Sequence, residues 1–152
     1  RRALQQHVRK MLAGTDRAHL VVAVVDLDDF KHINDTYGHQ AGDDALVAVG
    51  RALGHAVFDT TAVIGRIGGE EFVVAAACRT ADPTLLSRRI CKAIADLPVH
   101  VTASVGTSSA EIRSLDGDEA ALHTLIERLV VAADEAMYRA KRAGGNRFRH
   151  AS

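Results

Sequence analysis

The chain has 152 residues, of which 47% are hydrophobic and 25% are charged, as in an ordinary globular domain with a single core. Nineteen basic residues balance nineteen acidic ones, so any anionic ligand must be bound by local groups. The longest apolar run, residues 20–25, is far shorter than the roughly 20 residues that cross a bilayer. The composition therefore favours a domain without nucleic-acid or membrane contacts.

The chain begins with Arg1 rather than Met and has no signal-peptide pattern, which predicts a fragment of a longer protein. Cys78 and Cys91 lack the spacing of a metal site or of a disulfide framework. They are therefore expected to be buried free thiols in the reducing cytoplasm.

The first half of the chain alternates helical and strand patterns. Apolar residues at helical spacing predict helices over residues 3–13 and 40–56. Residues 20–25 form a short β-branched run, typical of a central strand covered on both faces, and Asp26 falls at its end. Residues 34–39 are typical of a turn, because Asn and Asp often bond their own backbone there.

Two strand-like runs, residues 62–67 and 72–77, are separated only by four residues that begin with Gly68 and Gly69. This is hairpin spacing, with glycines where positive φ is expected.

The second half continues with a helix opened by Pro83 and with an alternating strand over residues 99–105. A loop is expected at residues 116–118, followed by a helix over residues 121–143, with a break midway as an alternative, and a short strand at residues 147–149. After the first helix the order is βααββαβ. It predicts an α/β (α+β) fold with a central, mixed, largely antiparallel sheet of about five strands flanked by helices.

Acidic residues are concentrated at two turns. Asp26, Asp28 and Asp29 follow the buried strand, and Glu70 and Glu71 lie in the hairpin. If Asp26 came within ~4 Å of Glu70, their repulsion at an effective dielectric of about 20 would be on the order of 4 kcal/mol. A hard divalent cation would reverse that penalty, and Mg²⁺ suits carboxylate and carbonyl ligands that leave room for phosphates. The alternative is that these acids are solvated turn residues.

Three further residues are candidates for ligand binding. Asn34 and Asp43 could read a purine edge, since a carboxylate accepts both N1–H and the exocyclic amine of guanine but not of adenine. Lys141 lies near the end of the last helix, where the helix dipole favours a cation in any protein.

Four segments together resemble the GGDEF family of diguanylate cyclases, in its GGEEF variant. The most specific are residues 26–43 and the hairpin segment 66–72, and residues 102–106 and 133–141 resemble later family motifs. The resemblance covers nearly the whole chain and implies a single catalytic domain, residues 1–152, truncated at its N-terminal edge. It also implies a fold like the polymerase palm and the class III nucleotidyl cyclases.

The resemblance implies that two GTP molecules are condensed into cyclic di-GMP and two pyrophosphates at the interface of a homodimer. It also implies an upstream sensor domain in the full-length protein, a cytoplasmic location, and a membrane anchor, if there is one, elsewhere in that protein. Two alternatives remain: a catalytically degenerate GTP-binding regulatory module and a mononucleotide cyclase.

The resemblance also implies roles for individual residues. Magnesium, or manganese as an alternative, is expected on Asp26, the Leu27 carbonyl and Glu70, with Glu71 for a second ion. Glu70 is also the candidate base. A Cβ at Gly68 or Gly69 is expected to restrict the turn and crowd the nucleotide. Guanine is assigned to Asn34 and Asp43. The β- and γ-phosphates are assigned to the backbone amides around Asp29, Phe30 and Lys31 and to the Lys141 side chain.

Two positions depart from the family pattern. Gly145 stands where many members have a phosphate-contacting Arg, for which Arg142 or Arg147 could compensate. Residues 59–62 read Asp-Thr-Thr-Ala where many cyclases carry the Arg-x-x-Asp product-binding site. Product inhibition through that site is therefore expected to be absent.

Overall fold

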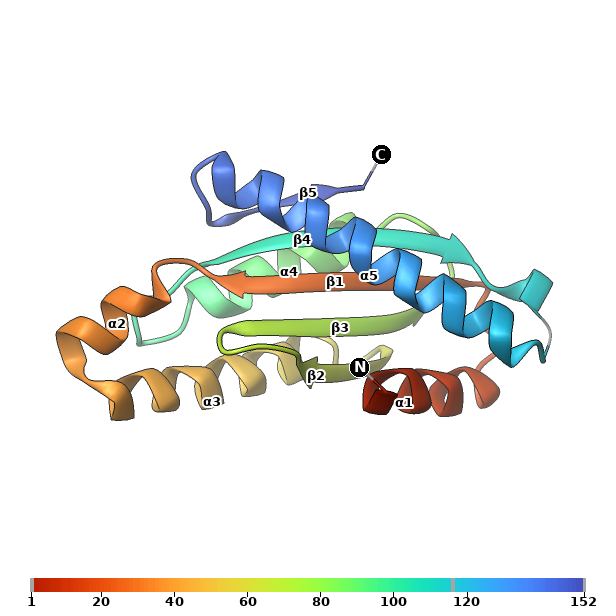
Figure 1. Cartoon of the computed structure of the whole chain (residues 1–152), viewed down its shortest axis with the longest axis horizontal. Coiled ribbons are helices and arrows are strands. Elements are labelled where there is room, and N and C mark those ends of the chain that lie inside the picture. Colours follow the sequence, from red (N-terminus) through yellow and green to blue (C-terminus); the bar gives the residue numbers. More distant parts are fainter. Residues whose placement is uncertain (1, 116, 152) are drawn as a thin grey trace.

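A five-stranded sheet in the order β2-β3-β1-β4-β5 forms the centre of the molecule (Figure 1). The computed structural model describes residues 2–115 and 117–151. β1 pairs antiparallel with β3 and β4, and β5 joins β4 in parallel. The predicted mixed, largely antiparallel sheet of five strands is therefore confirmed. Its strands are β1 (His19–Leu27), β2 (Thr61–Arg66), β3 (Glu71–Cys78), β4 (Ala103–Glu111) and β5 (Arg147–His150).

Over residues 2–115 and 117–151, five α-helices and one 3₁₀ turn surround the sheet. In the described residues, no helix combines the length and the apolar character needed to cross a bilayer. The helices are α1 (Arg2–Ala13), α2 (Phe30–Tyr37), α3 (His39–Ala56), α4 (Thr84–Ala95) and α5 (Glu119–Arg142), and the 3₁₀ turn is η1 (Arg113–Leu115).

β1 is covered on both faces, which explains its continuous apolar run. On one face Val22 and Val24 belong to a cluster with α1 and α5. On the other face Val25 and Leu27 belong to a cluster with α2, α3 and α4. Figure 1 shows α5 in front of the sheet and α4 behind it. Asp26, one residue along from Val25, therefore faces the side of the sheet that carries α5.

The close packing of α5 on β4 depends on Gly106. A Cβ at this position would lie 2.0 Å from the Ala133 carbonyl oxygen and 2.0 Å from the Met137 amide nitrogen. Neither backbone atom can move without displacing α5. Gly106 therefore fixes the height of α5 above the sheet, and with it the position of Lys141 near the helix end.

The predicted turn at residues 34–39 is wrong, because this segment is helical up to Tyr37. Phe30 and Ile33 are buried one turn apart and anchor α2 in the core, which outweighs the turn propensity of the polar residues. The chain changes direction only at Gly38, whose φ of 91° is accessible to glycine at little cost.

The predicted strand at residues 99–105 is displaced along the chain. The Val101 amide bonds the Val99 carbonyl at 2.8 Å in a tight turn, and β4 starts only at Ala103. Helix α5 is continuous, and Asp118 caps its start by accepting from the Ala121 amide at 3.0 Å. Arg1, Asp116 of the loop expected at residues 116–118, and Ser152 lie outside the described residues.

Cys78 and Cys91 are free thiols, as predicted, and both are half-buried rather than fully buried. Burial raises the pKa of both, and that of Cys91 reaches about 11. Both are therefore protonated at neutral pH and poorly nucleophilic.

Candidate active site

Asp26 is the centre of the candidate site, at the end of β1 nearest α2. It is only 9% exposed and pairs in register with Glu71 of β3 and Ser104 of β4. The neighbouring Leu27 amide donates to the Glu70 carbonyl at 3.2 Å, which joins β1 to the hairpin turn. The sheet thus brings the two acidic turns to the same end of β1 and β3.

The register places Glu71, rather than Glu70, directly opposite Asp26. Burial raises the pKa of Glu71 above its ordinary value of 4.5, and the nearby carboxylates of Asp26, Asp134 and Glu70 raise it further. These acids therefore form a repulsive cluster when all of them are ionised.

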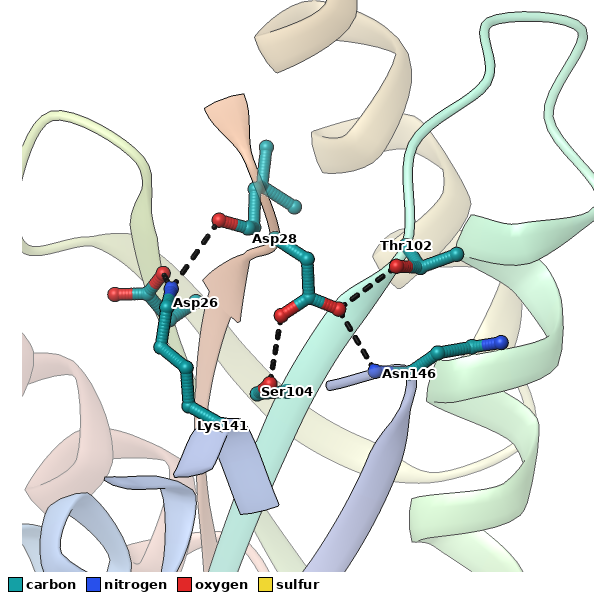
Figure 2. Close-up of polar contacts among 7 residues, drawn as sticks. Asp26, Asp28, Thr102, Ser104, Lys141 and Asn146 are labelled. Atoms are coloured by element: carbon teal, nitrogen blue, oxygen red, sulfur yellow. Dashed lines mark hydrogen bonds and ion pairs between the residues drawn. The ribbon is translucent and has the colours of Figure 1, made fainter. Parts of the chain in front are cut away.

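Lys141 lies against this cluster. Its ammonium group donates to Asp26 Oδ1 and lies 3.4 Å from the Leu27 carbonyl oxygen (Figure 2). In this structure its side chain pairs with Asp26, and its predicted contact with the phosphates stays a prediction. Helix α5 therefore delivers a positive charge to the two oxygens that were predicted to bind a metal.

These oxygens fit a divalent cation by the chemistry of the donor set, since a carboxylate and a carbonyl are hard oxygen donors and already hold a cation. Among residues 2–115 and 117–151, no three His, Cys, Asp or Glu side chains are arranged as a metal-binding group. A cation here would therefore rely on the Leu27 carbonyl in addition to carboxylates.

The hairpin turn differs from the prediction at its glycines. Neither Gly68 nor Gly69 has a positive φ. A Cβ at Gly69 would have no atom within 4 Å, and one at Gly68 would meet only the Glu71 side chain, at 3.1 Å. The backbone conformation of the hairpin turn therefore does not itself require glycine at these two positions.

The start of α2 presents backbone amides near the end of β1 that carries Asp26. Asp29 is left-handed, with φ 50°, and its side chain does not cap the helix. Phe30 is 8% exposed and anchors the first turn, whereas Lys31 is exposed. The amides around these residues are thus the N-terminus of a helix, where an anion is favoured.

Asn34 and Asp43 come from consecutive helices that meet at Gly38. A Cβ at Gly42 would lie 1.8 Å from Asn34 Oδ1, so the Asn34 side chain lies directly over Gly42. Asp43 is the next residue of α3 and is exposed. The side-chain amide predicted to read guanine therefore lies over the residue that precedes Asp43 in α3.

Asp28 is the residue whose role the sequence did not reveal. Its carboxylate accepts three hydrogen bonds, from Thr102 Oγ1 at 2.7 Å, from Ser104 Oγ at 2.7 Å and from the Asn146 amide at 2.8 Å (Figure 2). The only signal in the sequence is its place in the acidic run that follows β1.

A groove of about 1010 Å³ lies elsewhere, between α1, η1 and the start of α5. Basic, acidic and apolar residues line it, including Arg9, Glu119, Ile112 and Leu122. Figure 1 places these elements at the end of the sheet opposite α2. This groove is therefore separate from the acidic residues around Asp26.

The sequence and the fold both match known proteins. Residues 1–147 match the family described as diguanylate cyclase, GGDEF domain. The chain is 38% identical over 154 residues to diguanylate cyclase DgcP of Pseudomonas aeruginosa, covering 97% of this chain and 22% of that protein. It is 36% identical over 139 residues to probable diguanylate cyclase DgcF of Escherichia coli O157:H7, covering 85% of this chain and 28% of that protein. The chain thus spans less than a third of these two relatives.

The fold resembles the active GGEEF domain of a diguanylate cyclase from Vibrio cholerae, with a TM-score of 0.76 and 29% identity. That likeness covers 100% of this chain and 96% of the other.

Proposed function

The chain belongs to the GGDEF family of diguanylate cyclases, and we propose that it condenses two GTP molecules into cyclic di-GMP and two pyrophosphates. In each of two steps the 3′-oxygen of one GTP bonds to the α-phosphorus of the other. The bond from that phosphorus to the β-phosphate oxygen breaks, and pyrophosphate leaves.

The observation that carries this proposal is the cation position at the end of β1. The Lys141 ammonium group lies between Asp26 Oδ1 and the Leu27 carbonyl oxygen, and Asp26 pairs in register with Glu71. Burial and, after it, three nearby carboxylates raise the pKa of Glu71, so an added divalent cation would relieve an existing repulsion. Such a site suits the triphosphate of a nucleotide, which brings further negative charge.

Magnesium, with manganese as an alternative, would be held by Asp26, the Leu27 carbonyl and Glu70, with Glu71 available for a second ion. When bound, the metal polarises the α-phosphate, acidifies the attacking hydroxyl and neutralises the leaving group. Glu70, which is half-buried in the hairpin turn, is the candidate base that takes the 3′-hydroxyl proton.

The protein's own groups would position the rest of the nucleotide. The Asp43 carboxylate can accept both N1–H and the exocyclic amine of guanine, and the Asn34 side chain lies over the preceding residue, Gly42. The amides around Phe30 and Lys31 begin α2, where the helix dipole favours the β- and γ-phosphates. This arrangement supports GTP as the substrate in preference to ATP.

A homodimer follows from the chemistry, because each GTP must be attacked by the hydroxyl of the other. One chain offers one set of Asp26, Asn34 and Asp43. Two chains in antiparallel orientation would bring two triphosphates together, so the rate should rise more than linearly with protein concentration.

The test is incubation of the purified protein with GTP and MgCl₂, followed by mass spectrometry of the product. We expect cyclic di-GMP and one pyrophosphate for each GTP consumed. Glu70→Ala should abolish the product. Glu127→Ala is the matched control, since Glu127 is exposed on α5 and pairs only with His123 in the described residues, at 3.4 Å. GTP binding without any dinucleotide, even in concentrated protein, would instead favour a regulatory GTP-binding module.

A further inference from the structure

The Asp28 carboxylate joins three segments that are distant in sequence. Asp28 follows the Leu27 carbonyl and precedes the left-handed Asp29. Thr102 and Ser104 lie at the start of β4, and Asn146 lies in the turn after α5. We propose that Asp28 is a positioning residue that fixes the loop from β1 to α2 for the triphosphate, an inference that depends on the proposed function.

The loop between β1 and α2 has few other restraints. The Asp28 amide donates to the Thr102 carbonyl at 2.9 Å, and the Asp29 side chain makes no capping bond to α2. Asp29 also holds a backbone conformation that side-chain-bearing residues rarely adopt, with φ 50°. Its orientation must therefore be set by neighbours. The Asp29 carbonyl accepts from the His32 amide at 2.9 Å, and the Asp28 carboxylate ties the preceding residue to Thr102, Ser104 and Asn146.

The Asp28 carboxylate also holds the turn that follows α5. Gly144, Gly145 and Asn146 all have positive φ, and the Asn146 amide donates to Asp28 Oδ2. A Cβ at Gly145 would lie 2.8–2.9 Å from the three carboxyl atoms of Asp28. Gly145, which departs from the family pattern, thus allows the chain to pass next to the Asp28 carboxylate. That carboxylate cannot easily move because three hydrogen bonds hold it. Asp28 couples the loop predicted to bind phosphate to the end of α5.

A direct metal role for Asp28 does not fit this geometry. Its Oδ1 accepts from one hydroxyl group, and its Oδ2 accepts from another hydroxyl and an amide. Figure 2 shows this carboxylate turned toward Thr102 and Asn146, and the Asp26 carboxylate facing Lys141. Asp28 therefore positions the loop from β1 to α2 and does not add a charge to the metal site.

Two substitutions separate position from charge. Asp28→Asn removes the charge but keeps the shape, because its carbonyl can accept from Thr102 and Asn146 while its amino group donates to the Ser104 hydroxyl. Asp28→Ala removes all three bonds. If position matters, asparagine should largely rescue the defect that alanine causes.

The measurement is calorimetric binding of 3′-deoxy-GTP with magnesium, and separately of GMP. The first ligand lacks the attacking hydroxyl, so it reports binding without turnover, and the second lacks the β- and γ-phosphates. For Asp28→Ala we expect 3′-deoxy-GTP affinity to fall about tenfold or more and GMP affinity to change less than about twofold. For Asp28→Asn we expect a change of less than about threefold in both.

Thr102→Val keeps the inference testable if Asp28→Ala does not fold. It removes one hydrogen bond to Oδ2 with little change of shape, so 3′-deoxy-GTP affinity should fall about threefold with GMP unaffected. Asp96→Ala is the control, because Asp96 is exposed and pairs only with Lys92 in the described part of the chain.

Three results would overturn the inference. The first is an equal loss of GMP and triphosphate affinity in Asp28→Ala, which would indicate general structural damage. The second is an Asp28→Asn variant as defective as Asp28→Ala, which would mean that charge is what counts. The third is wild-type affinity in both Asp28→Ala and Thr102→Val. If the wild-type protein itself fails to bind the triphosphate, the proposed function is refuted first, and this inference with it.

Discussion

Replacing Lys141 with methionine removes the ammonium group from Asp26 while keeping a side chain of similar length. The Lys141 side chain is 35% exposed and that of Asp26 is 13% exposed. An exposed ion pair contributes at most about 1 kcal/mol, whereas breaking a buried one costs roughly 3–5 kcal/mol. This half-buried pair lies between, so Lys141→Met should lower the free energy of unfolding by about 1–2 kcal/mol. For a chain of this size, Tm should fall by roughly 3–6 °C.

The decisive part of this experiment is the response to magnesium without nucleotide. In the wild-type protein a metal ion must displace the ammonium group from Asp26 and Leu27, and in Lys141→Met it need not. Magnesium should therefore raise Tm more in the variant than in the wild type, measured by differential scanning calorimetry.

Lys92→Met is the matched control for Lys141→Met. Lys92 pairs with Asp96 on the surface of α4, with side chains 77% and 62% exposed. This variant should lose less than about 0.5 kcal/mol and respond to magnesium as the wild type does. If magnesium raised Tm equally in the wild type and in Lys141→Met, Lys141 would not occupy the cation position and the reasoning would be refuted.

Three other substitutions test neighbouring parts of the site. Gly42→Ala would place a Cβ 1.8 Å from Asn34 Oδ1, so GTP affinity measured by calorimetry should fall about tenfold, with little loss of stability. Gly106→Ala should lower the free energy of unfolding in urea by about 3 kcal/mol or more, because two backbone atoms of α5 lie 2.0 Å from the new Cβ. In metal-free protein, Glu71→Gln should raise Tm at neutral pH. Because the pKa of Glu71 is raised in the folded protein, the wild type loses stability as the pH rises above 4.5 and through that raised pKa. The gain in Tm of the variant over the wild type should therefore vanish below pH 4.5, the ordinary pKa of the group.

Each of these expectations has a contradicting result. For the Gly42 variant it is unchanged GTP affinity, which would place guanine elsewhere. For the Gly106 variant it is a stability equal to that of the wild type. For the Glu71 variant it is a Tm gain that grows as the pH falls. Gly54→Ala is the control for both glycine variants, since a Cβ there would meet no atom within 4 Å.

The sheet could be predicted from the sequence because its signals are local. The β1 run is apolar on both faces and short, and the hairpin is marked by two adjacent glycines between two strand patterns. Helix α2 was missed because Asn34, Asp35 and Thr36 favour turns, and only its anchors Phe30 and Ile33 indicate a helix.

The sequence named residues that lie near Asp26, but it did not indicate which of them contact each other. Residues near Asp26 were identified, yet the register that sets Glu71 opposite Asp26 depends on where the hairpin closes. The role of Asp28 was hidden because its partners lie 74, 76 and 118 residues along the chain. The Lys141 contact depends on how closely α5 packs at Gly106, which no local pattern encodes.

The proposed function is tested most directly by the rate of product formation from GTP and from ATP, followed by mass spectrometry at increasing protein concentration. We expect cyclic di-GMP from GTP, little product from ATP, and a rate per chain that rises with concentration as dimers form. A cyclic mononucleotide product, or equal use of both nucleotides at a rate per chain independent of concentration, would contradict it.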